Sequence, residues 1–284
     1  MADRQRAGSR VVAGGNRRSR ILGGGGAGRS TLIAAVSTVA FFGLLALVVT
    51  SSPGWPEVRE QFFDWEIFKE SLRDIGPKLL VNIRIFLIAE VFILVFGLTI
   101  AILRSLPGPV FFPVRLLMVV YADFFRGVPT ILVIYLFGFG VPALAISGVP
   151  RSEFFWGVVA LVLVYSAYVS EVYRAGIESV HPSQEAAARS LGLSRAKAMR
   201  FVVLPQAVRR VIPPLLNDFI GLQKDTALVA LIGPVEAFRQ SQIEVAANFD
   251  YTPYFATALL FVALTIPMAR FTDWLVARER RRRR

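Results

Sequence analysis

Residues 185–205 of this 284-residue chain read Glu-Ala-Ala-Ala-Arg-Ser-Leu-Gly-Leu-Ser-Arg-Ala-Lys-Ala-Met-Arg-Phe-Val-Val-Leu-Pro. The stretch is polar, and long apolar runs flank it on both sides. Glu185 falls in the first turn of the expected helix, where the helix dipole favours an acid, and the alanines after it are strong helix formers. Gly192 is free to end that helix in a left-handed conformation, and Ser183 and Ser194 are expected to cap the helices before and after the turn. The pattern predicts a helical hairpin held across the ends of neighbouring apolar spans.

The composition around this hairpin is that of a membrane protein. Hydrophobic residues make up 55% of the chain and charged residues 18%, whereas a soluble domain carries about 25% charged residues. Several apolar stretches reach the length of about 20 residues that a helix needs to cross a bilayer. The sequence therefore predicts an all-α fold, an integral membrane helical bundle of about six transmembrane helices with a cytoplasmic hairpin.

The formal net charge of +12 is concentrated at the two ends of the chain. Residues 1–29 contain seven arginines and one acid, and residues 278–284 contain six arginines and one acid, which together give 11 of the 12 charges. Basic segments next to apolar spans stay on the cytoplasmic side, where they also meet anionic lipids. We therefore expect cytoplasmic N- and C-termini, membrane lipids as contacts, and no nucleic acid as a partner.

Composition divides the chain into five segments. Residues 1–30 are rich in Gly, Arg and Ser and are expected to be a disordered basic tail, and residues 31–50 an extra N-terminal transmembrane helix. This apolar run is longer than that of a signal peptide, so we expect it to be retained. Residues 51–76 are expected to form an external loop whose aromatic residues favour a short interfacial helix. Residues 77–277 form the main transmembrane domain, and residues 278–284 a second basic tail.

Within the main domain, apolar runs and their interruptions predict five spans. The second is expected to follow a short interfacial helix, and the fourth is interrupted by prolines and polar residues. With the N-terminus inside, the basic loop between the third and fourth spans falls on the cytoplasmic side. The expected ranges are 78–104, 128–145, 154–174, 207–233 and 253–276 for the spans and 111–122 for the interfacial helix.

Several kinds of chemistry are excluded by the residues present. The chain has no cysteine and one histidine, so disulfides, thiol catalysis and metal sites built from cysteine or clustered histidine are excluded. Residues 23–30 approach the spacing of a phosphate-binding loop, but Arg29 stands where lysine belongs and no strand precedes them. We predict no enzyme activity, no metal and no cofactor, and any ATP hydrolysis is expected on a separate partner subunit.

Short motifs along the main domain occur in a fixed order. Together with Glu185-Ala186-Ala187, Gly192 and Leu204-Pro205, they resemble the permeases of bacterial type I ABC importers, in the branch for polar amino acids such as histidine, arginine, glutamine and glutamate. The resemblance covers residues 77–277. The other motifs are Phe125–Pro129, Ala167–Ile177, Leu204–Ala207 and Lys224–Leu228.

The resemblance implies a transport complex. Its expected members are two permeases, identical or related, two ATP-binding subunits that dock on the hairpins, and an extracytoplasmic amino-acid-binding protein. The chain departs from the pattern at Ala227, where many members have serine, and at Ser183, where many have glycine. The residues carried over to the ATPase-coupling helix are Glu185, Ala186, Ala187 and Gly192.

Polar residues inside the apolar segments mark a candidate gate or substrate path, because charges at membrane depth are costly and face a cavity or a partner. Asp225 or Thr226 is expected to cap a second half-helix, as in the broken helices that form transport sites. The alternative is that Lys224 and Asp225 pair with neighbours and only stabilise the break. The candidate residues are Lys224, Asp225, Thr226 and Glu90.

Four other charged residues are placed near the cytoplasmic ends of the spans. Asp123 and Arg126 are expected to anchor the cytoplasmic interface. Glu171 and Arg174 are expected at the inner end of their span, in an ion pair with the hairpin.

The sequence thus predicts the permease subunit of an ABC importer for polar amino acids in the bacterial plasma membrane, coupled to its ATPases through the hairpin of residues 182–205. The main alternative is a stand-alone secondary transporter or channel, whose uptake would follow an ion gradient without any ATPase. A DNA-binding membrane sensor is a further alternative, because residues 187–194 look like a helix-turn-helix. Apolar spans on both sides keep such a hairpin from reaching a major groove.

Overall fold

The computed structural model describes residues 27–281, and this part of the chain contains helices and turns but no strand. It forms two units, up to Val58 and from Arg59 onwards, which are considered separately. In the first unit, α1 (Ala27–Thr50) begins four residues before the predicted start of the first span. The remainder of the predicted basic tail, residues 1–26, lies outside the described residues.

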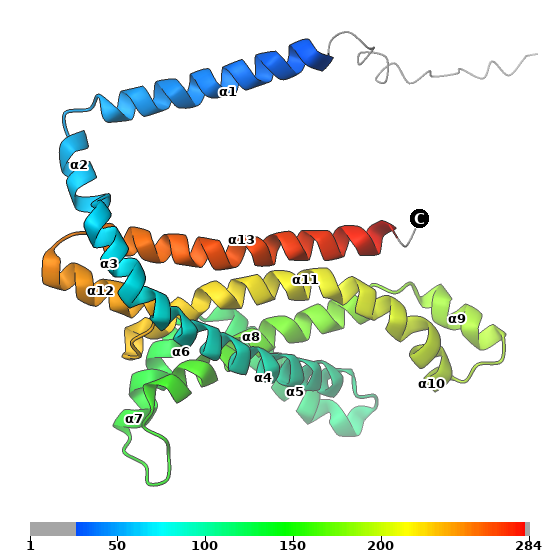
Figure 1. Cartoon of the computed structure of the whole chain (residues 1–284). Helices are drawn as coiled ribbons and strands as arrows, with labels where there is room; N and C mark the ends of the chain where they lie inside the picture. The colour runs from blue at the N-terminus through cyan, green and yellow to red at the C-terminus, as the bar shows by residue number, and fades with distance from the viewer. Residues whose placement is uncertain (1–26, 282–284) are drawn as a thin grey trace, which may run out of the picture. The chain divides into compact units, whose positions relative to one another are not determined.

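The second unit is a bundle of helices joined by turns (Figure 1). Short 3-10 or π segments interrupt several of the connections, and the longest 3-10 segment, Thr226–Ile232, follows α11 directly. Beginning with the helix that crosses the boundary between the units, the helices are α2 (Trp55–Phe62), α3 (Trp65–Ile75), α4 (Leu79–Ser105), α5 (Phe112–Gly127), α6 (Thr130–Tyr135), α7 (Val141–Ala143), α8 (Glu153–Glu178), α9 (Pro182–Ser190), α10 (Arg195–Ala198), α11 (Leu204–Asp225), α12 (Ala237–Asn248) and α13 (Thr252–Arg281).

Helix α8 packs against α4, α5 and α11. Its residues Leu161 and Val164 are fully buried and share one apolar cluster with Ile85 and Ala89 of α4. In lipid, helices associate through close packing, which small residues at the contact favour. The α4 and α8 pair is therefore the core that positions the remaining helices.

Two glycines mark where helix backbones approach most closely. A Cβ atom on Gly97 of α4 would lie 2.6 Å from a methyl carbon of Val169 on α8. A Cβ atom on Gly176 of α8 would overlap Val211 of α11. Any side chain at these positions would force the helices apart, so the packing of α8 depends on both glycines.

Among residues 27–281, four helices are long and apolar enough to cross a membrane, and the number rises to five if a bent pair of helices counts as one span. This pair is Pro109–Gly127 with Thr130–Ala143, whose two parts meet at 105°. The other four are Arg29–Thr50, Trp55–Ser105, Glu153–Glu178 and Thr252–Arg278.

Helix α11 corresponds to the one expected span not yet described, residues 207–233. Its 22 residues extend over about 33 Å, which is long enough to cross the hydrocarbon core. It is less apolar than the other spans and contains Pro213 and Pro214, so it does not meet the same apolar criterion. Backbone interruptions of this kind are tolerated at membrane depth where neighbouring helices cover them. The chain is a helical membrane bundle, as predicted.

Some predicted boundaries were wrong. Helix α5 continues to Gly127, five residues past the predicted end at 122, and stops because Val128 precedes Pro129 and adopts an extended conformation. Pro129 is the N-cap of α6, so this helix begins at Thr130, two residues after the predicted start of the span at 128. At the other end, α13 continues to Arg281 and includes the first residues of the predicted basic tail.

The predicted external loop contains two short helices instead of one. Helix α3 is capped by Asp64, whose carboxylate accepts hydrogen bonds from the amides of Glu66 and Ile67 at 2.8 and 2.9 Å. Phe62, just before this cap, stacks on Tyr251 at a centroid distance of 5.1 Å. The aromatic residues that suggested an interfacial helix therefore also hold this segment against the start of α13.

Candidate functional site

The hairpin of residues 182–205 projects from the ends of α8 and α11 (Figure 1). Its first helix, α9, is capped by His181, whose Nδ1 accepts a hydrogen bond from the Ser183 amide at 3.2 Å. The prediction that Ser183 caps this helix was wrong. Pro182 supplies the fixed backbone angle of a first helical residue, which makes the residue before it the cap.

The face of α9 divides into exposed and buried positions. Glu185 lies in the first turn, as predicted, and its Oε1 is 3.7 Å from Arg195 Nε across the hairpin. Ala186 and Ala187 are exposed, whereas Ala188 is buried inside the hairpin. The exposed surface of α9 thus includes two adjacent small side chains, which allow another protein to approach the helix backbone closely at this point.

The turn of the hairpin is a Schellman motif. Gly192 has φ +86°, the left-handed conformation predicted for it. Its amide donates to Arg189 O at 2.9 Å, and the Leu193 amide donates to Ala188 O at 3.2 Å. Ser194 caps α10, as predicted, by accepting from the Lys197 amide at 3.4 Å.

A small apolar cluster holds the hairpin against the bundle. Val180, Val203 and Ala207 are buried together, with Met199 packed on them. The guanidinium of Arg210 also donates to the carbonyl of Ser179 at the end of α8. The hairpin is therefore anchored at the ends of both α8 and α11.

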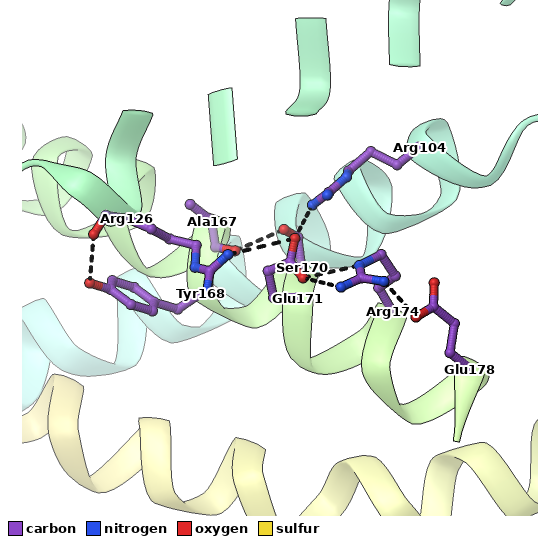
Figure 2. Close-up of polar contacts among 8 residues, drawn as sticks. All are labelled: Arg104, Arg126, Ala167, Tyr168, Ser170, Glu171, Arg174 and Glu178. Atoms are coloured by element: carbon purple, nitrogen blue, oxygen red, sulfur yellow. Dashed lines mark hydrogen bonds and ion pairs between the residues drawn. The ribbon is translucent and has the colours of Figure 1, made fainter. Parts of the chain in front are cut away.

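Glu171 on α8 is the centre of an ionic cluster, the Glu171 cluster (Figure 2). Its carboxylate accepts from Arg104 of α4 and from Arg174 Nε and Nη2 at 3.0 and 2.8 Å. Arg126 of α5 lies 3.8 Å away, and Arg174 also donates to Glu178 at 2.5 Å. The predicted ion pair between this region and the hairpin was wrong, because α4 and α5 bring their own arginines to Glu171.

The candidate gate lies at the opposite end of α11 from the hairpin (Figure 1). Lys224 is exposed, Asp225 is half-buried and accepts from Tyr165 Oη at 2.9 Å, and Thr226 is fully buried. The α-helix breaks here, but neither Asp225 nor Thr226 caps a second half-helix through its side chain. The hydroxyl of Thr226 donates back to Gln223 O at 2.7 Å, so the chain tightens into a 3-10 helix instead.

A buried hydrogen-bond network, the Asn82 network, encloses Thr226. Asn82 Nδ2 donates to Thr226 Oγ1 at 3.2 Å and to Glu236 Oε2 at 2.7 Å, and Asn82 Oδ1 accepts from the Ala237 amide at 3.1 Å. These side chains are at most 2% exposed. Burial raises the pKa of the Glu236 carboxyl, and hydrogen bonds from the Phe238 amide, Asn82 and the Arg239 amide oppose that shift.

Neither Asn82 nor Glu236 was among the site residues predicted from the sequence. A signal was available for Asn82, because an amide side chain within an apolar run is costly unless it is paired. Glu236 stands directly before α12 and accepts from two of its first amides, at 2.9 and 2.7 Å, which is the position of an N-cap. Their connection to Thr226 depends on tertiary packing and had no local signal.

Glu90 does not join the segment of Lys224, Asp225 and Thr226. It is half-buried on α4 and interacts electrostatically with Asp218 of α11. Among the described residues, Asp218 Oδ2 is buried without a hydrogen-bond partner. These two carboxyl groups come from different helices, α4 and α11.

The fold and the hairpin define the membrane component of a transport complex. Residues 93–281 match the family described as "Binding-protein-dependent transport system inner membrane component". The chain belongs to this family. It is therefore a multi-pass membrane permease of the ABC importer class, and the assignment does not favour a stand-alone transporter or channel.

Individual relatives agree with this assignment. The chain is 32% identical over 204 residues to a probable amino-acid permease protein, YxeN, of Bacillus subtilis, covering 72% of this chain and 90% of the relative. It is 34% identical over 185 residues to a probable glutamine ABC transporter permease, GlnM, of the same organism, covering 65% and 83%. A crystal structure of an amino acid ABC transporter with histidines superposes with a TM-score of 0.70 at 30% identity, covering 76% of this chain and 98% of that chain.

Proposed function

We propose that this permease imports polar amino acids across the bacterial plasma membrane. The names of the relatives support this class of substrate, since they include an amino-acid permease, a glutamine permease and an arginine permease. ATP is hydrolysed on two separate ATP-binding subunits, and an extracytoplasmic binding protein delivers the substrate. A second permease, identical or related, completes the path.

The observation that carries the proposal is the construction of the hairpin. Helix α9 exposes Ala186 and Ala187 at its surface, while Arg210 and the cluster around Val203 fix the hairpin to both α8 and α11. An ATPase that grips this exposed face moves two spans at once. Glu185 contributes a carboxylate at the start of α9, and Gly192 permits the turn that returns the chain to the membrane.

The orientation in the membrane follows from the charges. The hairpin region carries several arginines, and the positive-inside rule places such loops in the cytoplasm. The hairpin end of α8 and α11 therefore faces the cytoplasm, and the end with α12 faces the binding protein. Both termini are cytoplasmic in this arrangement.

The substrate path passes between α4, α8 and α11. Glu90 and Asp218 supply carboxylates that would meet the ammonium group of an amino acid. Further along α11, the segment of Lys224, Asp225 and Thr226 lies where the α-helix becomes a 3-10 helix, and it forms the outer gate. Tyr165 holds Asp225 in place from α8.

A Glu185→Lys substitution tests the docking role. It reverses the charge at the start of α9, opposes the helix dipole and places a cation beside Arg195. We expect the purified permease to retain its ATPase subunits at least about tenfold less well, equivalent to about 1.4 kcal/mol, and uptake to fall with it. Glu57→Lys is the matched control, since Glu57 is an exposed acid on α2.

The outcome is measured by co-purification and by uptake of labelled amino acid in proteoliposomes that contain the complete transporter. Equal retention of the ATPases by both variants would refute the role of Glu185. ATP-independent uptake driven by an ion gradient, with no ATPase bound, would refute the importer assignment as a whole.

A further inference from the structure

A pocket lined by arginines and apolar side chains lies at the hairpin end of the bundle, away from the candidate substrate path. It has a volume of about 370 Å³ and opens where the end of α4, the start of α5 and the last turns of α8 meet. Arg174 on its wall lies eight residues before the start of α9. The lining residues are Arg104, Phe112, Arg115, Leu116, Val119 and Arg174.

The polar part of this basic pocket is cationic. Three arginines line it, and the described lining contains no acidic residue. Glu171 lies behind them and accepts from both Arg104 and Arg174, which fixes the two guanidinium groups in place. With Arg126 and the exposed Glu178 included, four arginines face two glutamates, so the region keeps a formal charge of +2.

The arginines have donors left for a ligand. A guanidinium carries five N–H groups in a planar fork. In the described part of the chain, Arg104 uses one terminal nitrogen for Glu171, and Arg115 uses one for Leu106 O at 2.8 Å. Remaining N–H groups of this kind bind phosphate or carboxylate oxygens in pairs. Three arginines around one pocket offer donors for more oxygens than the two of a single carboxylate, which favours a phosphate.

The rest of the pocket is apolar and comes from one face of α5. Phe112, Leu116 and Val119 follow the helical spacing of i, i+4 and i+7, with Arg115 on the same face. Phe112 and Leu116 are 55% and 50% exposed, which suits contact with acyl chains better than contact with water. A soluble phosphate would leave these side chains uncovered.

We propose that this pocket binds the phosphate headgroup of an anionic phospholipid, with an acyl chain along the Phe112, Leu116 and Val119 face of α5. Basic pockets between transmembrane helices bind anionic lipids in this way. The pocket joins α4, α5 and α8 at the end of α8 that leads into the hairpin. A lipid bound here stabilises the helix ends against which the hairpin moves. The site is separate from the proposed substrate path and goes beyond the proposed transport function.

Native mass spectrometry of the permease tests the site. The detergent-purified protein is titrated with phosphatidylglycerol, with phosphatidylcholine, or with phosphatidylglycerol in the presence of inorganic phosphate. We expect one phosphatidylglycerol to be retained in preference to phosphatidylcholine. We also expect millimolar inorganic phosphate to leave that lipid in place, because the soluble ion makes no contact with the apolar face.

Arg115→Gln is the test variant, since it removes one charge without breaking the Glu171 cluster. Its dissociation constant for phosphatidylglycerol should rise about fivefold, and Arg115→Lys should restore part of the loss. Arg270→Gln is the matched control, because Arg270 is 80% exposed and lies outside the pocket lining. This substitution should change the dissociation constant for phosphatidylglycerol less than twofold.

Thermal unfolding of each variant separates a binding defect from a folding defect. The proposal would be overturned by equal retention of the two lipids or by equal effects of the Arg115 and Arg270 variants. Displacement of the lipid by inorganic phosphate would assign the pocket to a soluble anion and overturn the lipid assignment.

Discussion

The two ends of α11 are built in opposite ways. At the hairpin end, α9 presents exposed small residues, and its polar contacts link residues close in sequence, such as Glu185 with Arg195. At the other end, Asn82 reaches Thr226, 144 residues away, inside a network that is almost fully buried. One end is an open surface and the other is a closed joint.

In the proposed mechanism, this difference allows a single helix to serve two purposes. A surface that receives a partner must be accessible, so it depends on local turn geometry and on a small apolar anchor. A joint that changes the path through the membrane must hold a defined position, so its polar groups are paired inside the protein. Substitutions should therefore affect stability at the closed end and coupling at the open end.

The largest effect on stability is expected from Asn82→Leu. This change leaves Glu236, the Ala237 amide and Thr226 without the hydrogen bonds that Asn82 makes. Buried groups that lose a partner cost about 1–3 kcal/mol each, so we expect the free energy of unfolding to fall by about 3 kcal/mol. Chemical denaturation in detergent micelles measures it.

Asn248→Leu is the matched control for this change, because Asn248 is exposed at the end of α12. Its effect should stay within about 0.5 kcal/mol. If the two variants were equally stable, the Asn82 network would not be the element that closes this end of α11.

Much of the fold could be predicted from the sequence because apolar length is a local property. Each of three features is indicated by residues that lie close together in the sequence. These features are the run of residues 31–50, the polar hairpin and the turn at Gly192. The Asn82 network could not be predicted in this way. Whether Asn82 faces Thr226 or lipid depends on the rotation of α4 against α8, which close packing at Gly97 and Val169 sets.

The next effect concerns the Glu171 cluster, which connects three helices near the open end. Glu171→Gln keeps the shape of the side chain but removes the charge that Arg104 and Arg174 share. Arg104 is only 12% exposed, so in this variant its guanidinium would be left largely buried and without a charged partner. We expect a loss of about 2 kcal/mol, measured by the same denaturation.

Glu178→Gln is the control, since Glu178 is 62% exposed and its ion pair with Arg174 should contribute less than about 0.5 kcal/mol. Equal losses in the two variants would mean that the cluster is a set of surface pairs. In that case the ion pairs of the Glu171 cluster would not link α4 and α5 to α8.

The candidate site was only partly predictable for the same physical reason. Charge alone assigned Glu171 to the hairpin, where several arginines were available. Packing instead brought Arg104 and Arg126 to it from α4 and α5. In contrast, the positions of Glu185, Gly192 and Ser194 in the hairpin followed from helix caps and turn geometry, which depend on neighbours in the chain.

The smallest effect on stability is expected at Gly192, where the comparison between the two ends is sharpest. A Cβ atom there would meet no atom within 4 Å, so Gly192→Ala adds backbone strain and no collision. A left-handed conformation costs an ordinary residue about 1 kcal/mol, whereas asparagine tolerates it better. We expect faster hydrogen exchange of the amides in α9 and α10 in Gly192→Ala, with Gly192→Asn closer to the wild type. In the proposed mechanism α9 receives the ATPase, so the alanine variant should also lose more transport per ATP than its small loss of stability would suggest. If amide exchange in α9 and α10 were unchanged in both variants, the turn would be held by packing against the bundle and not by the conformational freedom of Gly192.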